Sequence, residues 1–250
     1  MPSPTLSTAR LRLAPGQIPH VWSGEELGAE SACLPSGHLL LDAELPGGGW
    51  PVGGVIELLQ AQPGRHVWQL LLPALALATR AQAGPVALVG APFVPFGPSL
   101  AGQGLAAERL LCVRADRAAA LLWSTEQCLR CADVVAVLAW LPQARSGELR
   151  RLHMAAQQHD KLLFVFRGLE MRQEASPARL RLQLEGVEEL AVHIFKRRGP
   201  PLQAPVLLPA RPARLEALLQ ARQKKPVPVP AVPEPVEGRS HALDRTAAFP

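Results

Sequence analysis

Two groups of residues have the side chains of a metal site without its spacing. Cys128 and Cys131 form a C-x-x-C pair, which is half of the ligand set of a structural zinc site. The pair falls within an expected helix, and no second pair or His partner has the spacing that completes such a set. His153 and His159 do not have the i, i+4 spacing of two ligands on one helix face. We therefore expect no metal, and buried or incidental cysteines.

A run of positive charge, Lys196-Arg197-Arg198, is the cluster most suited to binding an anion. It is either a solvated strand end or a contact with DNA phosphate or an acidic partner surface. Residues 1–190 hold 16 Lys and Arg against 17 Asp and Glu, whereas residues 191–250 hold 10 against 4. The basic character thus belongs to the C-terminal part, and charge alone does not choose between the two kinds of partner.

The leucine spacing predicts a short helix over residues 212–223, with three leucines on one side and basic residues around them. Such a helix could dock in the groove of a partner protein. With the run at 196–198, its candidate contacts to a partner or to DNA are Arg214, Leu215, Leu218, Leu219, Arg222, Lys224 and Lys225. Prolines recur from Pro226 onward, which predicts a disordered, polyproline-like tail over 226–250.

The middle of the chain alternates strands and helices. Apolar runs such as Val134 to Leu138 lack polar alternation, as strands do when helices cover both faces of a sheet. This predicts an α/β fold with a mostly parallel sheet covered on both faces. Alternation at 180–185, followed by 191–195, predicts an antiparallel pair at the sheet edge. We expect strands at 55–59, 85–89, 109–113, 133–138 and 162–166, and helices at 36–45, 67–78, 98–103, 117–131 and 147–159.

Four segments follow from these patterns. Residues 1–22 are expected to be a loose lead-in, 23–202 one domain, 203–225 a basic segment with the short helix, and 226–250 the tail. The helix over 36–45 would place Leu39, Leu40 and Ala43 on one face. No apolar run reaches the ~18 residues of a membrane span, and no secretory signal is recognised, so we expect a cytoplasmic protein.

Several motifs, in order, resemble the RecA ATPase core and, within that superfamily, the ImuA family. The segment from Leu34 to Leu58 is similar to the entry of the RecA core, where a glycine-rich stretch runs into a strand and the phosphate loop. The resemblance covers about residues 20–202. The details that resemble ImuA are Leu34-Pro35-Ser36-Gly37, Glu57-Leu58-Leu59, Gln62-Pro63-Gly64, Ala139-Trp140-Leu141-Pro142 and Ile194-Phe195-Lys196-Arg197-Arg198-Gly199.

The resemblance places a phosphate loop between the first strand and the long helix, and that loop is degenerate. A working loop needs glycines, a Lys for the β/γ-phosphates and a Ser or Thr hydroxyl for Mg²⁺. Gln60, or Leu59 with a shifted gap, stands at the first glycine. Gly64 remains, but Arg65-His66 or His66-Val67 stands where Lys-Thr is needed, and Pro63 removes one N–H.

The acidic positions that the resemblance implies are also lost. The water-activating Glu of the family falls at Ala91-Pro92, and its Mg²⁺-ordering Asp falls at Leu138. Mg·ATP is thereby left without its ligands. We therefore expect no cofactor and no catalytic activity.

The resemblance then implies a noncatalytic RecA-like adaptor in SOS-induced mutagenic translesion synthesis. Its partners would be ImuB, which is a Y-family-like protein, an error-prone C-family DNA polymerase subunit and, as a further candidate, RecA. DNA binding would be weak and without sequence preference. One alternative is a RecA-like ATPase or nucleotide sensor in DNA repair that uses Arg65 in place of Lys. Another is an SOS cell-division inhibitor of the SulA type.

Overall fold

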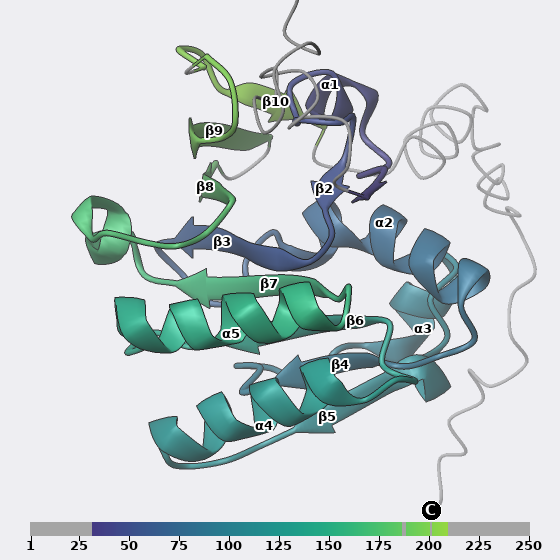
Figure 1. Ribbon diagram of the computed structural model, residues 1–250. Helices are drawn as coiled ribbons and strands as arrows, with labels where there is room; N and C mark the ends of the chain where they lie inside the picture. Colours follow the sequence, from purple (N-terminus) through teal and green to yellow (C-terminus); the bar gives the residue numbers. More distant parts are fainter. Residues whose placement is uncertain (1–31, 187–188, 201, 210–250) are drawn as a thin grey trace, which may run out of the picture. The chain divides into compact units, whose positions relative to one another are not determined.

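The computed structural model describes residues 32–186, 189–200 and 202–209. Their main feature is one eight-stranded sheet in the order β10-β9-β8-β3-β7-β6-β4-β5 (Figure 1). Neighbouring strands from β8 to β5 pair in parallel, and β8-β9-β10 pair antiparallel. The strands are β3 (Gly54–Gln60), β4 (Val86–Val89), β5 (Leu110–Val113), β6 (Ala136–Trp140), β7 (Leu162–Arg167), β8 (Leu180–Glu185), β9 (Leu190–Lys196) and β10 (Val206–Leu208). The predicted α/β fold with a mostly parallel sheet is confirmed.

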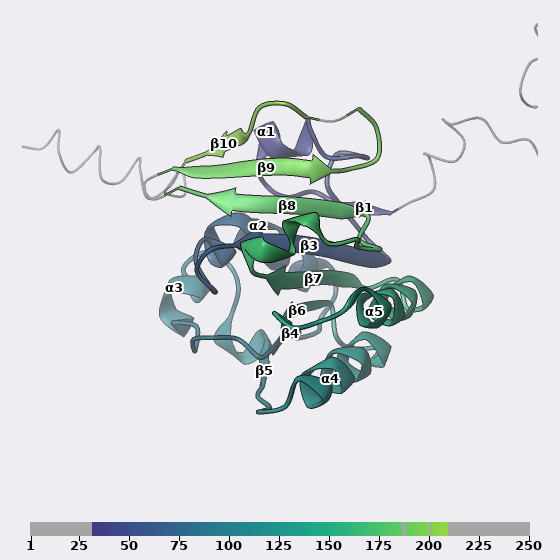
Figure 2. The same cartoon turned by 90° about the vertical axis from the view of Figure 1, so that its left-hand side faces the viewer.

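Helices cover both faces of the parallel part of the sheet. Figure 2 shows α2 (Val67–Ala81) and α3 (Gly97–Ala101) on one side, and α4 (Ala118–Arg130) and α5 (Ser146–Gln158) on the other. Each face has its own apolar core, and β3, β4, β6 and β7 are buried along their whole length. The lack of polar alternation in these strands follows directly from this double cover.

The apolar stripe of α2 explains its place against the sheet. Val67, Leu70, Leu71, Ala74 and Leu75 follow the helical repeat and are buried, whereas Pro73 of the same helix is exposed. Each fully buried Leu stabilises the fold by roughly 1.5–3 kcal/mol. Across the part of the chain that the structure describes, no helix is both long and apolar enough to cross a membrane.

The strand predicted over 133–138 is shifted, since β6 begins at Ala136 and ends at Trp140. Its start is delayed because the Val134 N–H donates to the Cys131 carbonyl and closes a turn after α4. Its end is extended because Trp140 pairs with Phe166 of β7, and the two rings stack with centroids 4.4 Å apart.

The helix predicted over 36–45 is wrong in length and in face. Helix α1 (Leu39–Asp42) has four residues, and the Asp42 carboxylate accepts a hydrogen bond of 2.7 Å from Ser36 N–H, which holds the preceding turn outside the helix. Leu41 is fully buried, whereas Leu39 is 88% exposed and Leu40 65%. On either side of α1, β1 (Cys33–Leu34) and β2 (Trp50–Pro51) form a small antiparallel pair.

The predicted antiparallel pair, β8 and β9, is confirmed, but it is not the edge of the sheet. Strand β10 pairs with β9 beyond it and was not predicted. Its three residues alternate buried, exposed, buried between Pro205 and Pro209, which is too short a pattern to recognise in the sequence. Two short 3₁₀ helices, η2 (Ala107–Arg109) and η3 (Leu169–Gln173), complete the elements.

Candidate functional site

The loop 61–66 joins the carboxyl end of β3 to the first residue of α2, as the resemblance predicts for a phosphate loop. Because β3, β4, β6 and β7 run in parallel, their carboxyl ends share one edge of the sheet. Ligands of open α/β sheets bind outside this edge. The loop therefore lies where a nucleotide could bind. Whether one fits depends on the side chains and backbone N–H groups of the loop.

The Gln60 side chain fills the loop from inside. With its amide turned so that the oxygen faces Gly64, Gln60 accepts a hydrogen bond of 2.9 Å from Gly64 N–H and donates one of 3.0 Å to the Arg65 carbonyl. Gln60 is only 4% exposed. A phosphate would need that backbone N–H and the space beneath it. Gln60, at the position of the first glycine, thus takes the backbone N–H that a phosphate would bind.

Arg65 and His66 are engaged in local contacts. Arg65 donates to the side-chain oxygen of Gln62 at 3.3 Å. His66 has a left-handed backbone, with φ of 62°, and its Nε2 lies 2.9 Å from the carbonyl oxygen of Gly186, past the end of β8. Its Nδ1 lies 3.0 Å from the side-chain oxygen of Gln69. These contacts point the ring across the loop toward Gly186.

Pro92 lies directly against the loop, where the resemblance places the lost acidic residue. A Cβ added at Gly64 would lie 3.0 Å from Pro92 Cγ and 3.1 Å from Phe93 Cδ2. Leu138 does not end β6; it lies fully buried inside the strand, two residues before Trp140. The side chain that β6 contributes near the loop is therefore the Trp140 ring.

Gly64, Pro92, Phe93 and Trp140 line one apolar pocket of about 260 Å³, and Leu138 does not. Phe93 and Phe96 are each 72% exposed and Val94 69%, so the rim offers apolar surface to solvent. Four of the chain's 11 aromatic residues line it, although aromatics make up only 4% of the sequence. The residues that define it are Gly64, Trp68, Pro92, Phe93, Phe96 and Trp140. We call it the aromatic pocket. The only sequence signal for it is the run Phe93-Val94-Pro95-Phe96 after a buried strand.

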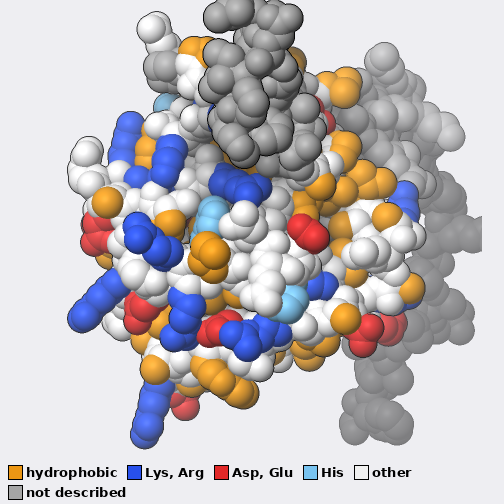
Figure 3. All heavy atoms as spheres, in the orientation of Figure 1, with side chains coloured by type: hydrophobic (Ala, Val, Ile, Leu, Met, Phe, Trp, Pro, Cys, Tyr) orange, Lys and Arg blue, Asp and Glu red, His pale blue; other side chains and the backbone are white. Residues whose placement is uncertain are grey.

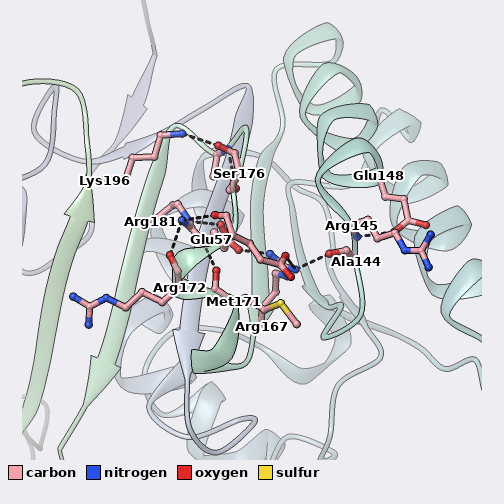
Figure 4. Close-up of polar contacts among 12 residues, drawn as sticks. Glu57, Ala144, Arg145, Glu148, Arg167, Met171, Arg172, Ser176, Arg181 and Lys196 are labelled. Atoms are coloured by element: carbon pink, nitrogen blue, oxygen red, sulfur yellow. Dashed lines mark hydrogen bonds and ion pairs between the residues drawn. The ribbon is translucent and has the colours of Figure 1, made fainter.

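A buried ionic cluster joins β3, β7 and β8, and it was not predicted from the sequence. The carboxylate of Glu57, fully buried on β3, accepts hydrogen bonds from Arg167 on β7 at 2.8 Å and from Arg181 on β8 at 2.6 Å (Figure 4). Arg167 also donates to the Ala144 carbonyl, and Arg181 to the Met171 carbonyl. The cluster ties three strands to the segments that cover them. Its charged groups are paired with one another, so we assign the cluster a structural role.

The predicted run Lys196-Arg197-Arg198 lies near the start of β3, at the opposite end of the parallel strands, where it meets Arg179, the residue before β8. Together the four cations line a pocket of about 530 Å³ whose other walls include Pro46 and Pro51. We call it the basic pocket. The antiparallel register that pairs Arg181 with Lys196 brings the two segments together. Arg179 was missed because this register is not visible in the sequence.

Burial and neighbouring cations both lower pKa values around the basic pocket. Burial lowers the pKa of Lys196, and the Arg181 guanidinium lowers it further, against an opposing effect of Glu57. Burial also lowers the pKa of His153, and Arg179 and Lys196 add to that effect. More broadly, Lys and Arg side chains gather on the left half of the face drawn in Figure 3, which is the side of α4 and α5. Anions are attracted to such a face.

The remaining candidates have no part in a common site. Cys128 is buried in α4 and Cys131 is exposed at its end, while His153 accepts a hydrogen bond from Val55 N–H at 3.3 Å. Among the described residues, no group of three or more His, Cys, Asp and Glu is placed to hold a metal ion. The candidate contacts from Arg214 to Lys225 lie outside the described residues, as do the expected lead-in and tail.

No model of a protein family matches the chain, and a search of curated proteins finds no match either.

Proposed function

We propose that this chain is a noncatalytic RecA-like adaptor of the ImuA type, which acts in SOS-induced mutagenic translesion DNA synthesis. The quoted motifs, the order of strands and helices, and the loop between β3 and α2 support this proposal. Its proposed partners are an ImuB-type protein and an error-prone C-family polymerase subunit, with RecA as a third. Work alongside DNA-bound polymerases would place it in the cytoplasm.

One observation carries the noncatalytic part: the Gln60 side chain holds a backbone N–H of the loop that a phosphate would need. Gln60 takes the Gly64 N–H, and the neighbouring positions are Pro92, Phe93 and Trp140. Phosphate charges placed among these apolar side chains would lose water without gaining a Mg²⁺ ligand, which costs several kcal/mol. An apolar surface with exposed aromatic rings has the composition of a protein-binding hot spot instead.

The adaptor role is tested by titrating the purified protein with the ImuB-type protein of the same organism. Phe93→Ser with Phe96→Ser should weaken binding about tenfold or more, because truncating a hot-spot anchor costs over ~1 kcal/mol. The matched control is Trp123→Ser on α4, a residue that is 61% exposed and lies on the other face of the sheet. Equal affinities for the double variant and the control would remove the aromatic pocket from the proposal.

A second experiment separates the adaptor from its rivals in the cell. Deletion of the gene should abolish damage-induced mutagenesis, and the Phe93→Ser, Phe96→Ser variant should restore it only in part. Filamentous cells on overexpression would favour a cell-division inhibitor. Tight binding of a fluorescent ATP analogue that depends on Mg²⁺ would favour a nucleotide sensor.

A further inference from the structure

The basic pocket is separate from the loop between β3 and α2. It lies at the start of β3, where a Cβ added at Gly54 would lie 2.8 Å from Arg179 Cδ, whereas the loop follows the last residue of that strand. Its lining comes from segments far apart in the sequence, around Cys33, Pro46, Arg179 and Lys196. The adaptor role proposed above makes no use of it.

We propose that the basic pocket binds a nucleoside phosphate unit, with the phosphate held by Arg179, Lys196 and Arg198. The unit can come from single-stranded DNA or from a free nucleotide, since both present the same phosphate, sugar and base. The proposal does not depend on the adaptor role, because no protein partner takes part.

Charge is the first reason. Among the described residues that line the pocket, four are Lys or Arg and none is Asp or Glu. Arg197 donates to the Glu44 carboxylate at 2.9 Å, and Arg179 donates to the Val52 carbonyl at 3.1 Å. Lys196 donates to the Ser176 carbonyl at 2.7 Å, which fixes the ammonium group beside the start of β8 (Figure 4). A phosphate oxygen accepts strong charge-assisted hydrogen bonds from such donors.

The cations also act on one another. Burial lowers the pKa of His153 and of Lys196; Arg179 and Lys196 add to the effect on His153, and Arg181 adds to the effect on Lys196. An anion bound among these cations would be stabilised by their charge. The bound anion should therefore raise the pKa of Lys196 toward its ordinary value.

Shape is the second reason, and it favours a nucleotide unit over a bare anion. A volume of about 530 Å³ falls within the roughly 300–1,000 Å³ of small-molecule sites and far exceeds what one phosphate needs. Pro46, Pro51 and Leu180 give the pocket apolar walls. A sugar and base can lie against these walls while the phosphate meets the cations. Lys196 and Arg198 are exposed at the margin, so a strand can pass through without burying its neighbouring units.

The test measures binding of a fluorescein-labelled 20-nucleotide oligo(dT) by polarisation, at salt from about 50 to 200 mM. Lys196→Gln with Arg198→Gln is the test variant, because both side chains are exposed and Arg197 keeps its contact with Glu44. Loss of two phosphate contacts should make the plot of log K against log salt less steep by about 1.4. At about 0.1 M salt this corresponds to an affinity about 25-fold lower. Arg114→Gln with Arg117→Gln, two exposed arginines outside the pocket, is the charge-matched control and should change binding little.

Competitors identify the source of the phosphate. If unlabelled oligo(dT) displaces the probe and millimolar dTMP or inorganic phosphate does not, the ligand is a DNA strand. Displacement by dTMP at low concentration assigns the pocket to a free nucleotide. Lys196→Arg with Arg198→Lys keeps both charges and should retain binding. The proposal is overturned if the wild-type protein binds none of these probes, or if the test variant binds as the control does.

Discussion

A single side chain, Gln60, decides much of what the loop after β3 can do. A glycine at this position would leave the Gly64 N–H and the space below it open, whereas Gln60 occupies both. Arg65, the one cation of the loop, points its guanidinium toward Gln62. A change at Arg65 alone would therefore leave Gln60 in its place in the loop.

We predict that Arg65→Lys does not create an ATPase. The variant still has Gln60 in the loop, and Pro92 and Leu138 stand where the resemblance places the acidic residues that activate water and order Mg²⁺. Phosphate release should stay at background for the wild type and the variant, with and without single-stranded DNA. DNA-stimulated turnover by the unmodified protein would contradict the noncatalytic assignment.

Glu57 is the residue whose loss should be most damaging. Glu57→Gln leaves Arg167 and Arg181 buried without their shared carboxylate, and breaking such a buried pair costs about 3–5 kcal/mol. The matched control is Glu126→Gln, because Glu126 is itself buried but pairs with Arg130 and Arg151, whose side chains are 56% and 59% exposed. That change should cost less than Glu57→Gln, because both arginines keep their contact with water. Urea unfolding of both variants checks the contrast, and equal midpoints would refute it.

At the level of elements, β10 is what closes the antiparallel side of the sheet. Val206 and Leu208 are buried, and their strand pairs with β9. A chain that ends after Gly199 should lose about 3 kcal/mol or more, since each buried Val or Leu contributes roughly 1.5–3 kcal/mol. A chain that ends after Ala210 keeps β10 and should unfold near the full-length midpoint. If both truncations unfold alike in thermal melts, β10 adds nothing to stability.

This difference also governs how the basic C-terminal segment should be tested. Truncation at Gly199 would remove β10 together with Arg214 to Lys225, so a loss of partner binding would have two explanations. Truncation after Ala210 keeps β10 and removes the candidate contacts together with the rest of the chain that follows. It is therefore the cleaner test of whether that segment binds a partner.

For the whole molecule, stability should fall as the pH drops below about 6.5. Burial lowers the pKa of His38 and of His153 from the ordinary value of 6.5. The unfolded chain therefore takes up these protons first, and the stabilisation present above pH 6.5 is lost as the pH falls toward the two folded-state pKa values. His153→Gln should flatten this dependence in urea titrations between about pH 7 and 5. An unchanged slope would show that His153 does not contribute.

The sequence predicted the parallel part of the fold well because its signals are local. The apolar stripe of α2 and the uniform strands β3, β4 and β7 each show a pattern within a few residues. What it missed depends on contacts between distant segments. Leu39 and Leu40 fit a helical face but remain in solvent, and Arg179 meets Lys196 only through the register of β8 with β9. The loop residues were predicted, but the Gln60 contact and the Trp140 ring depend on geometry.

The placement of β3 has a consequence for synthesis of the chain on the ribosome. This strand is an early part of the described chain, yet its two partners, β7 and β8, come more than a hundred residues later, and the Glu57–Arg181 pair spans 124 residues. At about 5–20 residues per second, β3 waits on the order of 6–25 s for its second neighbour. Such non-local pairing is slow and leaves an apolar strand open to wrong partners meanwhile. We therefore expect the nascent chain to depend on chaperones until β8 has emerged.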